Sequence, residues 1–74
     1  MEVEVELFGQ LAEKRKRCIT LTLEHPLSVM EVAALLDVKL TIVGLVTING
    51  LQSELQDEVP PSSRLCFFPY LSGG

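Results

Sequence analysis

The sequence has 74 residues, of which 47 % are hydrophobic, and a formal net charge of −4. This length fits one domain, and the hydrophobic fraction is too high for a disordered chain. The acidic balance argues against nucleic-acid binding, which needs a basic face for phosphate contacts. No apolar run approaches the roughly 18 residues of a membrane span, and the acidic N-terminus does not resemble a signal peptide. We therefore expect a cytoplasmic protein with no membrane or nucleic-acid partner.

Two alternating segments at the start predict a β-hairpin. In residues 1–8, apolar side chains alternate with glutamates, which predicts a strand with one buried and one solvated face. Residues 10–17 are polar and predict a loop with one helical turn. Residues 19–23 alternate again and are rich in β-branched side chains, which favours a second strand paired with the first. The glutamates assigned to the solvated face are Glu2, Glu4 and Glu6.

A capping signal marks the start of the main helix. Ser28 is the expected N-cap, and Glu31 three residues later completes a capping box. An apolar stripe at helical spacing follows, and the helix is expected to end within residues 37–39. The stripe consists of Val29, Val32, Ala33, Leu35 and Leu36.

The second half of the sequence predicts more strands. Residues 42–48 favour a third strand, and Asn49-Gly50 after it is a strong turn signal. Residues 51–59 are expected to hold a short edge strand and a tight turn. Residues 64–68 favour the last strand, which Pro69 ends. One helix packed across one face of a mixed, four- to five-stranded sheet is an α+β arrangement.

Familiar catalytic motifs are absent from the sequence. It has one histidine, no Gly-rich phosphate loop before a helix, and no spacing typical of a metal site, so we expect no bound metal. Cys18 and Cys66 lie in predicted strands, and we interpret them as buried small hydrophobes rather than reactive thiols. Residues 14–17 are four consecutive cations, which we interpret as a solvated turn rather than a nucleic-acid patch.

The end of the sequence offers another kind of chemistry. Gly73 and Gly74 have no side chains, so their backbone is slim and conformationally free. Such a segment can enter a narrow channel and present its carboxylate to another protein. We therefore divide the sequence into a domain at residues 1–70 and a flexible tail at residues 71–74.

The order of the elements and the final motif form a more specific pattern together than either does alone. The pattern consists of a first strand ending in Leu7-Phe8, a capped helix, the strand end Val46-Thr47-Ile48-Asn49-Gly50 and the ending Phe67-Phe68-Pro69-Tyr70-Leu71-Ser72-Gly73-Gly74. Over the whole chain it resembles the MoaD/ThiS sulfur-carrier family. The ending is more similar to the MoaD branch, the small subunit of molybdopterin synthase, than to the ThiS branch. The fold implied by this resemblance is the ubiquitin-like β-grasp.

The resemblance implies a carrier role for Gly74. A ubiquitin-activating-type adenylating enzyme, similar to MoeB or ThiF, would use ATP and magnesium to form an acyl-adenylate on the Gly74 carboxylate. Sulfur from a persulfide would then displace AMP and leave a thiocarboxylate. A large synthase subunit similar to MoaE would accept the tail and pass the sulfur to a pterin precursor, helped by proximity once the tail is docked. The domain itself would hold no permanent cofactor.

The resemblance also implies roles for the residues around the tail. Those that thread the partner's channel would be Ser72 and Gly73, and those that contact the partner would be Phe8, Phe68, Tyr70 and Leu71. The alternative places Phe8 and Phe68 in the protein's own core. We favour the interface, because each follows an inward residue and exposed apolar patches mark interfaces.

Two departures from the family pattern affect these expectations. The stretch at residues 61–64 reads Pro-Ser-Ser-Arg, where family members commonly carry Gly-Asp, so a contact through that acidic turn is not carried over. Tyr70 stands where a second proline is frequent, which makes the start of the tail less stiff.

Four functions remain open on the sequence alone. They are a sulfur carrier for molybdopterin or its tungsten relative, a ThiS-like carrier for thiazole, a ubiquitin-like modifier joined to lysines through Gly74, and an interaction module without C-terminal chemistry. The first three need an activating enzyme and differ in the acceptor of the activated end. One residue appended after Gly74 would abolish those three and leave the fourth intact.

Overall fold

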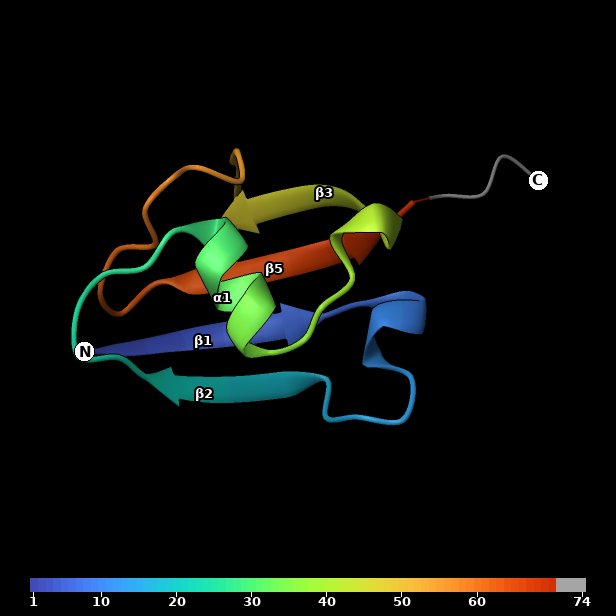
Figure 1. Cartoon of the computed structure of the whole chain (residues 1–74), viewed down its shortest axis with the longest axis horizontal. Coiled ribbons are helices and arrows are strands. Elements are labelled where there is room, and N and C mark those ends of the chain that lie inside the picture. Colours follow the sequence, from blue (N-terminus) through green and yellow to red (C-terminus); the bar gives the residue numbers. More distant parts are fainter. Residues whose placement is uncertain (71–74) are drawn as a thin grey trace.

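The computed structural model describes residues 1–70 as a sheet of five strands with one α-helix on one face (Figure 1). The elements in chain order are β1 (Glu2–Leu7), the 3-10 turn η1 (Gly9–Ala12), β2 (Cys18–Thr22), α1 (Val29–Leu35), the 3-10 turn η2 (Leu40–Ile42), β3 (Val43–Ile48), β4 (Leu51–Gln52) and β5 (Arg64–Pro69). Every predicted element is present, including the short edge strand. The predicted tail, residues 71–74, lies outside the described residues.

The sheet is mixed, with the strand order β2-β1-β5-β3-β4. β1 and β2 form the predicted antiparallel hairpin, whereas β5 pairs in parallel with β1 and antiparallel with β3. The crossover helix α1 joins β2 to β3, which run in the same direction on opposite sides of the central β1–β5 pair. In the parallel pair, Leu7 of β1 is opposite Phe67 of β5, so both strands finish at the same end of the sheet.

The core lies between the sheet and α1. Alternate residues of β1 and β5 point toward the helix, and each large apolar side chain buried in this way stabilises the fold by about 1.5–3 kcal/mol. The helix contributes the predicted stripe, except that Leu35 is 61 % exposed, so its assignment to the buried face was wrong. The fully buried side chains are Val3, Val5, Leu7, Val29, Val32, Ala33, Val59, Leu65 and Phe67.

Hydrogen bonds define both ends of α1. At the start, the Ser28 Oγ accepts from the Glu31 N–H at 3.1 Å, and the Ser28 N–H donates to Glu31 Oε1 at 2.9 Å, as the capping box predicted. Hydrogen bonding to the Glu31 carboxyl by the Ser28 backbone N–H and then by the Ser28 side chain lowers the pKa of this carboxyl, so its contribution to stability is lost as the pH falls through that lowered pKa. At the end, Asp37 has a φ of 56°, and the Val38 N–H bonds to the Ala33 carbonyl. This left-handed residue ends the helix before the expected range.

Replacing Ser28 with alanine is expected to lower the free energy of unfolding by about 1 kcal/mol, because the Glu31 N–H loses its acceptor. Urea denaturation followed by circular dichroism measures the loss. Thr41→Ala is the control, since the exposed Thr41 hydroxyl makes no hydrogen bond within residues 1–70. The capping role is refuted if both variants lose the same stability.

Candidate functional site

The face of the sheet opposite α1 is not covered by any other element among residues 1–70. On the same described residues, no group of His, Cys, Asp and Glu side chains is placed to hold a metal ion. Nor is any helix in this part of the chain both long and apolar enough to cross a membrane. The candidate site consists of side chains on this uncovered face, at the end of the sheet where β1 and β5 finish.

An aromatic stack lies where β1 and β5 end. Phe8 directly follows β1 and Phe68 belongs to β5, and the parallel pairing of the two strands brings the rings together. Their centroids are 4.4 Å apart, and the ring planes differ by 11°. Both side chains are half-buried and lie outside the core cluster. The alternative that placed these two phenylalanines in the protein's own core was therefore wrong.

The stack forms part of an apolar hollow of ≈ 500 Å³ at the surface. Leu45 of β3 pairs with Phe68 and extends the hollow across a third strand. Tyr70, the last described residue, is 63 % exposed. The hollow, named here the aromatic hollow, is lined by Phe8, Gly44, Leu45, Phe68, Pro69 and Tyr70. It thus borders the point from which residues 71–74 continue.

Two glycines allow close contact with the end of β5. A Cβ atom on Gly44 would lie 3.0 Å from the Tyr70 Cα, and one on Gly9, whose φ is +56°, would lie 3.0 Å from the Pro69 Cγ. The register of β3 against β5 shifts at Gly44, and the Tyr70 N–H donates to the Ile42 carbonyl at 3.0 Å. The sequence analysis missed Gly44, although a glycine inside a strand is a known signal of a bulge or close approach.

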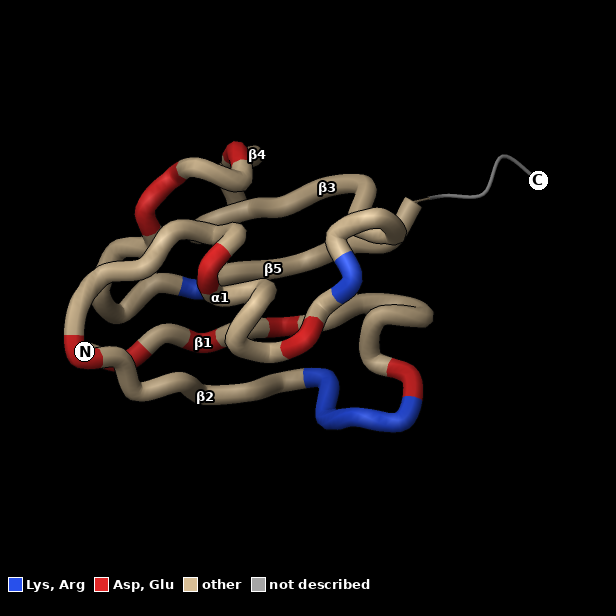
Figure 2. The backbone as a smooth tube through the Cα atoms, in the orientation of Figure 1, with Lys and Arg blue, Asp and Glu red and all other residues tan. Residues whose placement is uncertain are grey.

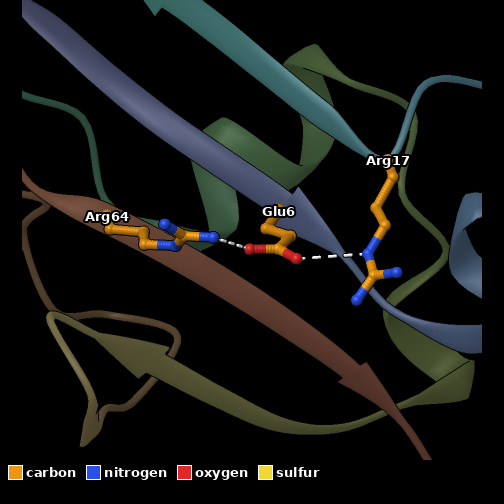
Figure 3. A network of polar contacts seen from close by, with 3 residues as sticks. All are labelled: Glu6, Arg17 and Arg64. Carbon is orange, nitrogen blue, oxygen red and sulfur yellow. Dashed lines mark hydrogen bonds and ion pairs between the residues drawn. The ribbon is translucent and has the colours of Figure 1, made fainter.

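A carboxylate is held between two guanidinium groups, one of which also contacts the aromatic stack; Figure 3 shows the carboxylate and the two arginines. Glu6 is only 8 % exposed, so the prediction that it is solvated like Glu2 and Glu4 on the same face was wrong. Its Oε2 accepts from Arg17 Nε at 3.1 Å, and its Oε1 pairs with the Arg64 guanidinium. The Arg17 Cζ also lies 4.9 Å from the centroid of the Phe8 ring. Arg17, the last of the four cations at residues 14–17, therefore belongs to the candidate site.

The cysteines differ in their environment. Cys66 is buried in β5, as the sequence analysis expected. Cys18 is exposed, so its interpretation as a buried side chain was wrong. It is the first residue of β2 and pairs with Glu6, which places it on the face opposite the helix, where no described element covers it.

Comparison with solved structures identifies the fold. No protein-family model matches the sequence, and the comparison with curated proteins gives no match. The crystal structure of SAMP1 from Haloferax volcanii has a TM-score of 0.77 and 24 % identity, with both chains fully covered. A second structure of H. volcanii small archaeal modifier protein 1 has a TM-score of 0.71 and 20 % identity, over 95 % of this chain and 98 % of that one.

A third similar structure is a complex of subunits 1 and 2 of the molybdopterin-converting factor from Helicobacter pylori. The matched chain has a TM-score of 0.68 and 20 % identity, with both chains fully covered. The chain has the ubiquitin-like β-grasp fold. The expected α+β class is confirmed, and so is the resemblance stated from the sequence, at the level of the fold.

The β-grasp domain brings together three of the predicted partner-binding residues. Phe8, Phe68 and Tyr70 all line the aromatic hollow. Their role in binding stays a prediction. The other predicted site residues, Leu71, Ser72, Gly73 and Gly74, lie outside the described residues.

Replacing Gly44 with alanine is expected to displace Tyr70, because the new Cβ would lie 3.0 Å from the Tyr70 backbone. Overpacking of this kind typically costs about 1–3 kcal/mol. Hydrogen exchange of the Tyr70 amide measures the effect, since its bond to Ile42 should open more often. In the control Gly50→Ala, the added Cβ meets no atom within 4 Å, and the cost is backbone strain at a φ of +84° in the turn between β3 and β4, so the Tyr70 amide should exchange as in the wild type. Unchanged Tyr70 exchange in Gly44→Ala would contradict the close contact.

Replacing Glu6 with glutamine is expected to lower the free energy of unfolding by about 1–2 kcal/mol, since two cations lose a buried anion but remain partly solvated. Chemical denaturation at low and high salt measures this loss. Glu4→Gln is a matched control on the same face of the same strand, because Glu4 is exposed and forms no ion pair within residues 1–70. The network has no stabilising role if both substitutions cost the same.

Proposed function

We propose that this β-grasp domain is a sulfur carrier of the MoaD type that works in the cytoplasm. The Gly74 carboxylate would be converted to a thiocarboxylate and would donate its sulfur in molybdopterin synthesis, with the chain acting as the small subunit of the synthase. The observation that carries this proposal is the position of the aromatic hollow. It borders Tyr70, from which the sequence continues into Leu71 and Ser72-Gly73-Gly74.

In this proposal the aromatic hollow would bind the partner protein, and the final residues would carry the reacting carboxylate. An exposed apolar surface of this kind is suited to docking a partner protein. Four residues after Tyr70 span at most about 14 Å when fully extended, so the partner's reactive centre would have to lie within that distance of the hollow. Ser72 and Gly73 would enter the channel to that centre, because the serine side chain is small and glycine has none, which leaves the backbone slim.

The chemistry requires activation before sulfur transfer. The Gly74 carboxylate would attack the α-phosphorus of ATP, with magnesium present, and pyrophosphate would leave. A persulfide sulfur would then attack the acyl carbon, AMP would leave, and a thiol would cleave the sulfur–sulfur bond to release the thiocarboxylate. The β-grasp domain would supply no catalytic side chain to these steps. It would hold the reacting end beside the partner's catalytic groups, and this proximity would raise the rate of each transfer step.

Two partner proteins follow from this proposal. An adenylating enzyme similar to MoeB or ThiF would activate Gly74, and a large subunit similar to MoaE would receive the sulfur. The second partner is supported by the similar H. pylori chain, which was solved as a complex of subunits 1 and 2 of the molybdopterin-converting factor. Both partners would use the aromatic hollow, so they would bind one after the other.

A second candidate is a ubiquitin-like protein modifier. The two structures of small archaeal modifier protein 1 have TM-scores of 0.77 and 0.71, against 0.68 for the molybdopterin-converting factor chain. Activation of Gly74 would be the same in this case. The acceptor would differ, since a lysine amine of a target protein would attack the acyl carbon and form an isopeptide bond.

Mass spectrometry of the protein isolated from its native host under reducing conditions tests the proposal. We expect a species heavier by the difference between sulfur and oxygen. Methionine oxidation adds nearly the same mass, so the change must be located. The tryptic fragment that begins at Leu65 contains no methionine and ends at Gly74 in the sequence, but it contains Cys66, which can also gain an oxygen. Fragmentation that places the change at Gly74 and not at Cys66 identifies the thiocarboxylate.

A chain with one alanine appended after Gly74 is the control and should give no such species. Fragments joining Gly74 to lysines of other proteins would favour the modifier instead. The sulfur-carrier proposal is refuted if only free carboxylate is found after incubation with ATP, magnesium, a sulfur donor and the host's adenylating enzyme.

A further inference from the structure

The two edges of the sheet differ in how far they are protected. β4 is two residues long, which leaves little free backbone at that edge. β2, at the other edge, has five residues, and no helix or strand among residues 1–70 lies outside it (Figure 1). Its sequence, Cys-Ile-Thr-Leu-Thr, has no proline and no charged side chain, which are the usual protections of an exposed edge. The outer edge of β2 is therefore open to pairing with another strand.

The hydrogen bonds to β1 show which backbone groups of β2 point outward. β1 donates to the carbonyl of Arg17 at one end of β2 and accepts from the N–H of Leu23 at the other. In an antiparallel pair such bonds recur at every second residue, so the backbone groups of Ile19 and Leu21 also face β1. The N–H and C=O groups of the residues between them point to solvent. These residues are Cys18, Thr20 and Thr22, and all three are exposed.

The edge is self-complementary in its backbone and in its apolar side chains. In an antiparallel pair of two β2 strands centred on Thr20, each Thr20 would exchange backbone bonds with Thr20 of the other copy, and Cys18 would do so with Thr22. Ile19 and Leu21 pack against the core but are only half-buried, so both keep apolar surface at the edge. Each Ile19 would lie opposite Leu21 of the other copy, and apolar pairs of this kind stabilise a sheet.

The charges at the two ends of β2 favour the same antiparallel arrangement. Four cations precede the strand at residues 14–17, in the blue segment that leads into β2 in Figure 2, and Glu24 follows the strand. Antiparallel pairing would set each cationic segment beside Glu24 of the other copy, whereas parallel pairing would set cations beside cations. Lys16 and Glu24 are exposed and form no ion pair within residues 1–70, so both can make this contact.

We propose that the open edge of β2 pairs with β2 of a second copy of this chain, antiparallel and centred on Thr20, so that two five-stranded sheets join into one. The aromatic hollow is not lined by β2, so both copies keep it free for a partner. A pairing of five residues is smaller than a stable interface requires, so the dimer forms at high protein concentration and dissociates readily. This inference goes beyond the proposed function and does not depend on the chemistry of Gly74.

Sedimentation equilibrium of the full chain under reducing conditions, from about 10 µM to about 1 mM, tests the dimer. We expect a monomer–dimer equilibrium. Thr20→Lys should raise the Kd of the dimer at least about threefold, because the two introduced lysines would lie directly opposite each other. Gln52→Lys is the matched control, since it makes the same charge change at an exposed position of the other edge strand, and its Kd should stay near the wild-type value.

Charge reversal tests the antiparallel orientation. In homodimers of Lys16→Glu, or of Glu24→Lys, like charges would meet at each end of the paired strands, so each variant alone should dimerise less than the wild type. A heterodimer of the two variants would restore opposite charges at both ends, although both chains keep a net negative charge. With one chain labelled with heavy nitrogen, native mass spectrometry of an equal mixture should find heterodimers above the half expected for random pairing.

Disulfide trapping tests the register. Two cysteines introduced at Thr20 would lie opposite each other in a hydrogen-bonded pair, where the Cα atoms are about 5.5 Å apart, within the range that a disulfide spans. We expect Cys18→Ser/Thr20→Cys to form a covalent dimer with oxidised glutathione. Cys18→Ser/Thr22→Cys is the matched control, since its two introduced thiols would be about 13 Å apart along the strands. Cys66, the remaining cysteine of both variants, is buried.

The outcomes decide between a second copy and other occupants of the edge. If the full chain stays monomeric up to about 1 mM, the inference is refuted. Equal Kd values for Thr20→Lys and Gln52→Lys, or equal trapping of the two cysteine variants, would place self-association elsewhere and refute it as well. A monomeric chain whose binding to another protein is weakened by Thr20→Lys would assign the edge to a strand of that protein. The carrier role is decided separately, by the mass of the C-terminal fragment.

Discussion

The parallel pairing of β1 with β5 is the contact on which both the core and the candidate site depend. It sets Leu7 opposite Phe67 on the face toward the helix, and both side chains are fully buried. The next residues, Phe8 and Phe68, must then point away from the helix and meet each other. A slip of one residue would expose the core pair. The energy of the core therefore holds the aromatic stack in its register.

The same pairing explains the buried carboxylate. Glu6 lies on the uncovered face, between β2 and β5, and receives one arginine from each side. Arg17 then bridges from this carboxylate to the Phe8 ring. A charge network and an apolar surface that differ in chemistry are thus built on the same two strands, on the face of the sheet away from the helix.

Local patterns predicted the elements well, because alternation and capping act between residues close in sequence. The strands and the capping box at Ser28 are examples. The error at Glu6 and the missed role of Gly44 came from contacts between distant residues. Glu6 alternates like a solvated glutamate, and nothing near it reveals that Arg64, 58 residues later, lies on the next strand. Gly44 is a similar case, because a Cβ atom at this position would lie 3.0 Å from Tyr70, which follows the neighbouring strand β5.

The proposed carrier role places conflicting demands on one small chain, and the fold separates them in space. A docking surface must be rigid to be recognised, and the aromatic hollow lies on paired strands whose register the core determines. A reacting end must enter another protein's centre, and Gly73-Gly74 carry no side chains that could obstruct it. Gly44 lies against Tyr70 and Gly9 lies against Pro69, where the docking surface gives way to the tail. Because the hollow adjoins this junction, any partner that recognises the rigid surface also receives the reacting end.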